Sequence, residues 1–363
     1  MSVSPQSKRT ASSTGRYATP ALARRILWAS LALAPATILV DVLAHPGKTA
    51  LFVLAAASLI PLAWLIGEST EHAAEHTGPG IGGYLNASFG NAPELIIALV
   101  AVSDGLYGVV LGSLAGSVIS NLLLVFGVSQ VVGEDGCELD RRSLFTQIGL
   151  CAAAIAIASP AIVLGWTGHS HHTGVVASVP VSIALLAVYL VIAGRNLRRH
   201  HEAERTEAHA SAWSFPVALA VLGVATLFTA FISEILVHSL EAFARAIGAT
   251  EFFIAAIVVA VVGNAAEHGG AVVIARAGKM KLASEIAISS SAQVALLVTP
   301  VVMLLSLAFS HHLALTFRWE GTAAMAGAVA LTALFVADGR SRRWEGFVLV
   351  ATFLAVAVWF WLA

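Results

Sequence analysis

The feature that most constrains this chain is a series of apolar runs, each about 20 residues long, separated by short polar breaks. A helix of roughly that length crosses the hydrocarbon core of a bilayer. Charged residues make up only 11% of the 363 residues, against roughly 25% in a soluble domain. We therefore expect an integral membrane protein embedded in a lipid bilayer. The net charge of −1 gives no basis for a nucleic-acid partner.

The apolar runs predict an all-α membrane protein with about eleven transmembrane helices. The predicted spans are 24–44, 48–70, 81–103, 106–132, 142–165, 175–195, 213–239, 249–276, 282–308, 315–337 and 344–362. Residues 1–23 are basic and rich in Ser and Thr, which predicts a disordered cytoplasmic arm. We predict a retained first helix rather than a cleaved signal peptide, because the first apolar run continues to Val42.

Lysine and arginine are distributed unevenly between the alternate loops of this topology. Seventeen lie on the side of the N-terminus, and only Lys48, Arg245 and Arg318 lie on the other side. Cytoplasmic loops carry an excess of these residues. The distribution therefore predicts a cytoplasmic N-terminus and, with eleven spans, a C-terminus outside the cell, in the inner (plasma) membrane.

Two short segments echo each other: GNAPE, which begins at Gly90, and GNAAE, which begins at Gly263. The offset of 173 residues continues downstream, where Ser117 falls on Ser290. The predicted topology makes the two copies run in opposite directions across the bilayer. Inverted repeats of this kind are typical of secondary transporters, whose binding site lies at the repeat interface near the membrane midplane. We expect an extra transmembrane helix over 24–46, a five-helix repeat over 47–195, a cytoplasmic linker over 196–212, and a second five-helix repeat over 213–363.

The repeated motif places an amide and a carboxyl group on one face of each helix, because Asn91 precedes Glu94, and Asn264 precedes Glu267, by three residues. A carboxylate at this depth costs roughly 2.5 kcal/mol or more unless it is neutralised, paired or hydrated. The nearby apolar sequence contains no Lys or Arg that could pair with either glutamate. Each glutamate therefore needs a proton or a bound cation, and alternation between these two states is the chemistry of a cation/proton exchanger.

The types of ligand indicate a hard cation. Ca2+ takes roughly 6–8 oxygen ligands, which carboxylates, the amide oxygens of Asn91 and Asn264, backbone carbonyls and water can provide. Zinc more usually binds several His or Cys residues. We expect helix breaks, which would turn backbone carbonyls toward the ion, at three residues of the motifs. These residues are Gly90, Pro93 and Gly263.

A second group of polar residues follows each motif and is expected to line the ion path. It consists of Ser117, Ser120, Asn121, Ser290 and Gln293. For the serines alone, close packing between membrane helices is an equally good explanation. His268 adjoins Glu267 and titrates near neutral pH, so we expect it to take part in proton coupling together with Glu94 and Glu267.

The two motifs, GNAPELIIAL and GNAAEHGGAVVIA, resemble the signature motifs of the cation/proton exchanger (CAX) branch of the calcium:cation antiporter superfamily. The segments SNLLLVFG, from Ser120, and SAQVALLVTP, from Ser291, extend the resemblance. It implies export of Ca2+ in exchange for protons, with Glu94 and Glu267 as alternating ligands. It further implies that Glu71 and Glu234 line the ion path. The family often has Thr in place of Pro93, and the strongly acidic linker of many members is absent here.

Other functions remain open on the sequence alone. The transported cation could be Mn2+, Na+ or K+, because their oxygen-ligand requirements overlap with those of Ca2+. A passive channel is a second class. A membrane zinc metallopeptidase is a third, because His72, Glu75 and His76 match the H-x-x-E-H signature. We expect no cofactor besides the transported ions, and the sequence leaves a homo-oligomer open.

Overall fold

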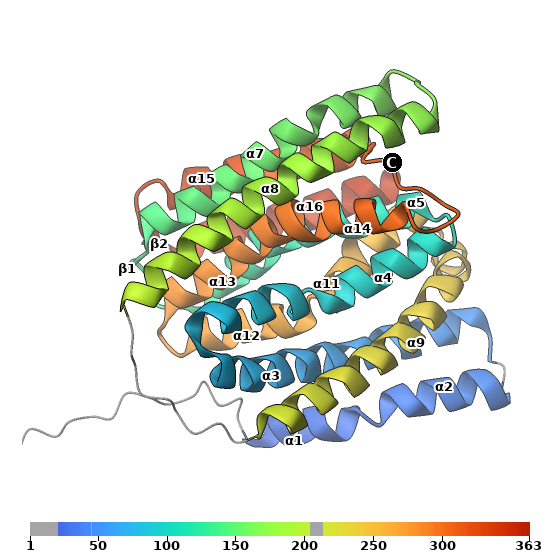
Figure 1. Cartoon of the computed structure of the whole chain (residues 1–363), viewed down its shortest axis with the longest axis horizontal. Helices are drawn as coiled ribbons and strands as arrows, with labels where there is room; N and C mark the ends of the chain where they lie inside the picture. Colours follow the sequence, from blue (N-terminus) through green and yellow to red (C-terminus); the bar gives the residue numbers. More distant parts are fainter. Residues whose placement is uncertain (1–20, 45, 204–212) are drawn as a thin grey trace, which may run out of the picture.

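The structure is a computed structural model that describes residues 21–44, 46–203 and 213–363. It is a bundle of helices with three π-helical stretches, named η, and one pair of two-residue strands (Figure 1). The elements are α1 (Ala21–Ser30), α2 (Leu33–Ala44), α3 (Lys48–Phe89), α4 (Ala92–Ser103), α5 (Tyr107–Ile119), η1 (Ser120–Val125), α6 (Phe126–Val132), β1 (Cys137–Glu138), α7 (Arg141–Trp166), α8 (His171–Ala203), α9 (Phe215–Ile247), α10 (Glu251–Phe253), η2 (Ile254–Val259), α11 (Ala260–Gly263), α12 (Ala265–Arg276), α13 (Met280–Gln293), η3 (Val294–Val298), α14 (Thr299–Ser306), α15 (Trp319–Val336), β2 (Arg340–Ser341) and α16 (Arg343–Leu362).

The described helices make the chain a multi-pass membrane protein. Nine of them are long and apolar enough to cross a bilayer, and the pair Glu251–Gly263 and Ala265–Arg276, bent by 60°, is a tenth candidate. The predicted span 81–103 is divided between the end of α3 and the short apolar helix α4. The helical architecture that the sequence predicts is therefore confirmed, with two of the predicted spans, 81–103 and 249–276, interrupted in the middle.

Two helix ends differ from the sequence-based expectation. Helix α9 continues past residue 239 to Ile247, because its last turns carry charged residues that the hydropathy pattern assigned to a loop. It ends where Gly248 adopts a left-handed conformation with φ 71°. Helix α8 extends through Ala203, so the first part of the predicted linker 196–212 is helical. Residues 1–20 of the predicted arm and 204–212 of the linker lie outside the described residues.

The small sheet is a further departure from an all-α chain. Strand β1 pairs antiparallel with β2, with Cys137 opposite Ser341 and Glu138 opposite Arg340. Residues 137–138 belong to the loop before α7, and residues 340–341 belong to the loop before α16. The pairing therefore joins one loop from each half of the chain. Two-residue strands carry too little alternation for a sequence pattern to reveal them.

The helices form two unequal groups. Helices α1, α2, α3 and α9 pack on one another at one side of the molecule, and Figure 1 shows them together along its lower edge. The pairing of α3 with α9 is the most extensive in the described structure. The other helices form the larger group, and α9 meets this group mainly through α4. We call the first group the α3–α9 layer and the contact between α4 and α9 the seam.

Close packing between α5 and η2 depends on Gly116. A Cβ atom at this position would overlap the backbone carbonyl of Ala256. Gly116→Ala should therefore destabilise the protein by about 1–3 kcal/mol, the usual cost of overpacking. We expect the apparent melting temperature in detergent to fall by roughly 3–10 °C. Gly108→Ala, on the same helix with open space around the new methyl group, is the matched control. Equal melting temperatures for the two variants would contradict the packing argument.

Candidate ion-binding site

Two helices are broken at the repeated motif, and the two breaks have almost the same backbone geometry. Asn91 lies between α3 and α4 with φ −95° and ψ 14°, and Asn264 lies between α11 and α12 with φ −90° and ψ 9°. Each break is followed by a new helix that carries a glutamate in its first turn, Glu94 in α4 and Glu267 in α12. The N-terminal end of a helix, with its free backbone N–H groups, stabilises a negative charge. Both carboxyl groups therefore lie where the backbone favours an anion.

The two breaks lie beside each other in space. Glu94 is buried, and its Oε1 atom would be 3.4 Å from a Cβ atom placed on Gly263, the last residue before the second break. Glu94 and Glu267 are also close enough to repel each other when both are charged. The two carboxyl groups are thus a candidate for a single site between the two halves of the chain. A shared cation or a shared proton would remove their repulsion.

Two hydrogen bonds cross between the halves at the breaks. The Asn91 side chain donates to Gln293 Oε1 over 3.0 Å. The Asn264 side chain donates to Ser117 Oγ over 2.9 Å and to the Ala260 carbonyl over 2.9 Å. All four side chains except that of Gln293 are buried. Each asparagine of the repeated motif is therefore held by the opposite half of the chain.

Glu267 is the end of a longer hydrogen-bonded chain. The Ser290 hydroxyl donates to Glu267 Oε2, and the Asn121 amide donates to Ser290 Oγ over 3.2 Å. The Oδ1 atom of Asn121 lies 3.0 Å from His268 Nε2. Because this oxygen only accepts, the assigned orientation of the Asn121 amide requires the hydrogen of His268 to be on Nε2. The donors of this chain are therefore all directed toward Glu267.

Glu94 has a different environment. Among the described residues, its Oε2 atom and the Oδ1 atom of Asn264 are buried oxygens without a hydrogen-bond partner. A buried acceptor left unsatisfied costs about 1–3 kcal/mol. A hard cation would satisfy both oxygens, because carboxylate and amide oxygens are its preferred ligands. The donor set at the two breaks therefore fits an ion of this class.

The structure gathers most, but not all, of the residues that the sequence singled out. Asn91, Asn264, Ser117, Asn121, Ser290, Gln293 and His268 are connected through the contacts above, around Glu94 and Glu267. Ser120, the first residue of η1, instead donates to the carbonyl of Ser117 in the preceding turn of α5. Glu71 and Glu234 are exposed residues of α3 and α9, and their place on the ion path stays a prediction.

Sequence reasoning missed Ser291, whose hydroxyl contacts the Val118 carbonyl over 3.4 Å. These two residues are 173 positions apart, the same offset that relates the two motifs. A contact between equivalent positions lies on the axis that relates two repeats. The offset itself was the signal that could have identified this pair.

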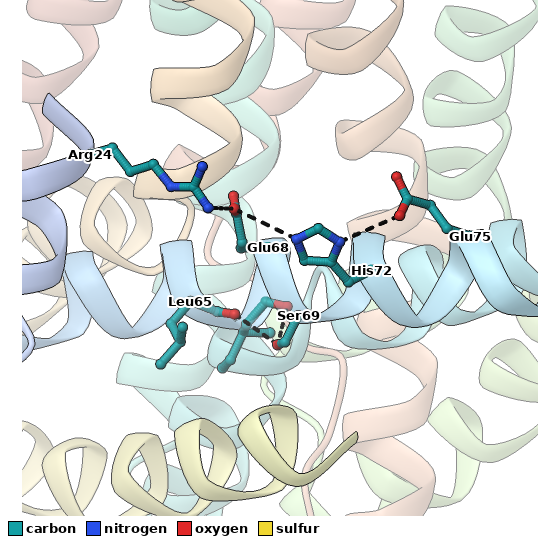
Figure 2. A network of polar contacts seen from close by, with 7 residues as sticks. Arg24, Leu65, Glu68, Ser69, His72 and Glu75 are labelled. Carbon is teal, nitrogen blue, oxygen red and sulfur yellow. Dashed lines mark hydrogen bonds and ion pairs between the residues drawn. The ribbon is translucent and has the colours of Figure 1, made fainter. Parts of the chain in front are cut away.

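The residues of the metallopeptidase signature make a different network (Figure 2). Glu68 Oε1 lies 2.9 Å from Arg24 and 3.9 Å from His72, and His72 Nδ1 lies 3.4 Å from Glu75. His76 instead contacts the Trp213 carbonyl over 2.8 Å. Within the described ranges, no three His, Cys, Asp or Glu side chains are arranged to hold a metal ion. The signature residues thus contact one another and other residues of α3, and His76 contacts Trp213, two residues before α9 begins.

The family of the chain follows from comparison with known proteins. The model of the family described as "Sodium/calcium exchanger protein" matches residues 47–197 and 217–362, which is most of the chain. The chain belongs to the sodium/calcium exchanger family. The two matched segments nearly coincide with the predicted repeats 47–195 and 213–363. Members of this family are transporters, so this exchanger-family chain is a transporter and not an enzyme.

Curated relatives and solved structures agree with this assignment. The chain is 38% identical over 332 residues to the Ca2+/H+ antiporter ChaA of Bacillus subtilis (strain 168), covering 88% of this chain and 94% of that protein. It is 33% identical over 341 residues to the Ca2+/H+ antiporter of Aphanothece halophytica, covering 87% and 91%. The structure of native YfkE has a TM-score of 0.81 at 34% identity and covers 93% of this chain and 100% of that chain. A structure of the H+/Ca2+ exchanger CAX, at 15% identity and a TM-score of 0.73, shares the fold.

Proposed function

We propose that this protein exports Ca2+ from the cytoplasm in exchange for protons, by alternating access to a site formed by Glu94 and Glu267. The observation that carries the proposal is that Glu94, from one broken helix, reaches the break of the other, where Gly263 and Asn264 lie. The unpartnered oxygens of Glu94 and Asn264 support a hard cation as the substrate. The names of the relatives, Ca2+/H+ antiporters, support Ca2+ as that cation.

Charge balance provides the coupling in this proposal. Two ionised glutamates and one Ca2+ make a neutral site, and so do two protonated glutamates. Either neutral form allows the helices around the site to rearrange. The empty site with two negative charges opposes rearrangement, because buried like charges repel and lack solvation. Ca2+ therefore crosses in one direction only when protons cross in the other.

The surroundings of the site favour access from one side. Around Glu94, the α4 residues Ile97, Ala98 and Ala101 are buried. On the other side, Glu267 is half-buried and Gly269 of α12 is exposed. Helix α12 ends at Arg276, in a part of the chain rich in Lys and Arg, which supports a cytoplasmic location of this end by the charge rule. We assign the structure to a cytoplasm-facing state of a plasma-membrane protein with a cytoplasmic N-terminus and an outside C-terminus.

Everted membrane vesicles test the proposed function. Respiration acidifies their interior, and addition of Ca2+ to the medium should release protons as Ca2+ enters. We expect dequenching of an acid-trapped fluorophore with Ca2+, and a smaller response with Mn2+, Na+ or K+. A passive channel would instead move radioactive Ca2+ at the same rate after the pH gradient is collapsed, and that result would refute antiport. A larger response with another cation would reassign the substrate.

A further inference from the structure

An ion pair closes the seam between α4 and α9. The Nε2 atom of His238, on α9, lies 3.1 Å from Oδ2 of Asp104, which caps the C-terminal end of α4. Helix α4 also carries Glu94 in its first turn, so one end of this helix forms the ion site and the other end is fastened to α9. The ion pair is therefore a link between the α3–α9 layer and the helix that carries the proposed site.

Charged groups near His238 lie on its own helix and across the seam. On α9 itself, Glu234 and Glu241 lie one turn before and one turn after it, and Glu241 is paired with Arg245 at 2.7 Å. Across the seam the facing charged group is Asp104, at the α4–α5 turn. The other side of the same turn is held by His311, which packs on Gly105 and contacts the Ser103 carbonyl over 3.1 Å. Helix α9 also packs on α2, α3 and α10, whose charged residues at this end are Asp41, Lys48 and Glu251. A proton on His238 directly meets the carboxylate of Asp104.

The seam beside the ion pair is formed by buried side chains. Ala98, Ala101 and Val102 of α4 are buried, and so are Ser233 and Val237 of α9. The ion pair itself is partly exposed, with 55% of the His238 side chain and 31% of the Asp104 side chain accessible. It thus lies at the rim of a closed contact, where medium on that side can protonate the imidazole. By the charge-derived topology, that side is the outside of the cell.

We propose that His238 and Asp104 form a latch that holds the outer side of the seam closed and is strengthened when acid outside the cell protonates His238. In this proposal, opening of the site to the outside separates α9 from α4, the helix that carries Glu94. A charged imidazole attracts Asp104, whereas a neutral one forms only a hydrogen bond. External acid then favours return of the proton-loaded carrier to the cytoplasm-facing state. The functional consequence rests on the function proposed above.

A distance measurement tests the latch without any transport assay. Spin labels at Ser103→Cys and Ala246→Cys, both exposed and on opposite sides of the seam, report its width in a protein that also carries Cys137→Ser and Cys151→Ala. Pulsed electron paramagnetic resonance should show a longer-distance population at pH 8 that falls about two- to fivefold at pH 5.5, the range expected for a partly exposed ion pair. In the His238→Gln variant, the fraction of molecules with the longer distance between the spin labels should not change with pH. In His238→Lys it should be low at both pH values.

His169→Gln is the matched control, because the ring of this exposed histidine contacts Thr167 two residues away and joins no two helices. It should keep the wild-type response to pH. A wild-type response in His238→Gln, or the same distances at both pH values in the unsubstituted protein, would overturn the latch. If Ca2+ addition releases no protons in vesicles but the seam still responds to pH through His238, the proposed function fails and the latch stands.

Discussion

Glu94→Gln and Glu267→Gln should each reduce Ca2+-driven proton release at least about 100-fold, because removing one partner of a buried charge pair costs about 3 kcal/mol or more. Glutamine resembles the protonated carboxyl group in size and hydrogen bonding. Each variant should therefore fold and insert normally but hold a cation poorly. The rate of fluorophore dequenching in everted vesicles, normalised to the amount of protein in the membrane, measures the loss.

Glu285→Gln is the matched control for these variants. Glu285 lies on the membrane helix α13, is half-buried, and faces Asp140 and Ser143 rather than the two motifs. Its replacement should leave the exchange rate within about twofold of wild type, as expected for a partly exposed charge away from the site. Appreciable Ca2+/H+ exchange by both Glu94→Gln and Glu267→Gln would contradict the assignment of the site.

Asn264→Leu should raise the Ca2+ concentration for half-maximal exchange by roughly 10- to 100-fold. The substitution keeps the size of the side chain but removes a buried oxygen and the bonds to Ser117 and Ala260. Loss of a polar group in a buried network costs about 1–3 kcal/mol. The initial rate of exchange as a function of Ca2+ concentration at fixed pH measures the effect.

Gln130→Leu is the control for replacing a buried amide by an apolar side chain. Gln130 lies on α6 against Gly346 of α16, and neither of its side-chain polar atoms has a hydrogen-bond partner in the described structure. This variant should exchange Ca2+ like wild type and should be at least as stable, since it removes unsatisfied polar atoms. If Asn264→Leu and Gln130→Leu behave alike, Asn264 has no special role in binding.

Most of the membrane architecture could be predicted because hydropathy reports directly on the surrounding solvent. The span 142–165 corresponds to α7 at Arg141–Trp166, and 344–362 corresponds to α16 at Arg343–Leu362. The hydropathy pattern did not predict the helix end correctly where a helix continues beyond the apolar environment. The last turns of α9 carry Glu241 and Arg245 on an exposed surface, so their polarity resembled that of a loop although the backbone hydrogen bonds continue.

The residues of the candidate site could be predicted from the repeated motif, but the hydrogen bonds between them could not. Glu94 and Glu267 were identified because charges inside a membrane are costly and these two recur at a fixed offset. The contact of Asn91 with Gln293 joins residues 202 positions apart, which no local periodicity encodes. The face assigned to Ser120 assumed a regular α-helix, yet η1 begins at this residue and changes the angular step between side chains.

The asymmetry between the two glutamates was also beyond sequence reasoning. The Ser290 hydroxyl donates a hydrogen bond to Glu267. Its equivalent in the first half, Ser117, instead accepts a hydrogen bond from Asn264. Asn121, which links Ser290 to His268, has the apolar Val294 at the equivalent position of the second half. One carboxyl group therefore accepts a hydrogen bond from a serine hydroxyl, and the other has a buried acceptor oxygen without a partner in the described structure. Two halves with matching motifs thus give a site with two different ligands.

The most direct test of the account is the number of protons released when Ca2+ binds to the purified protein. Calorimetric titrations in buffers of different ionisation enthalpy measure this number at several pH values. If the two glutamates hold either protons or Ca2+, binding of Ca2+ should release protons, and the affinity for Ca2+ should weaken as the pH falls. The Glu94→Gln/Glu267→Gln double variant should show neither effect. Ca2+ binding without proton release, or unchanged binding by the double variant, would contradict the claim that both ions use these two carboxyl groups.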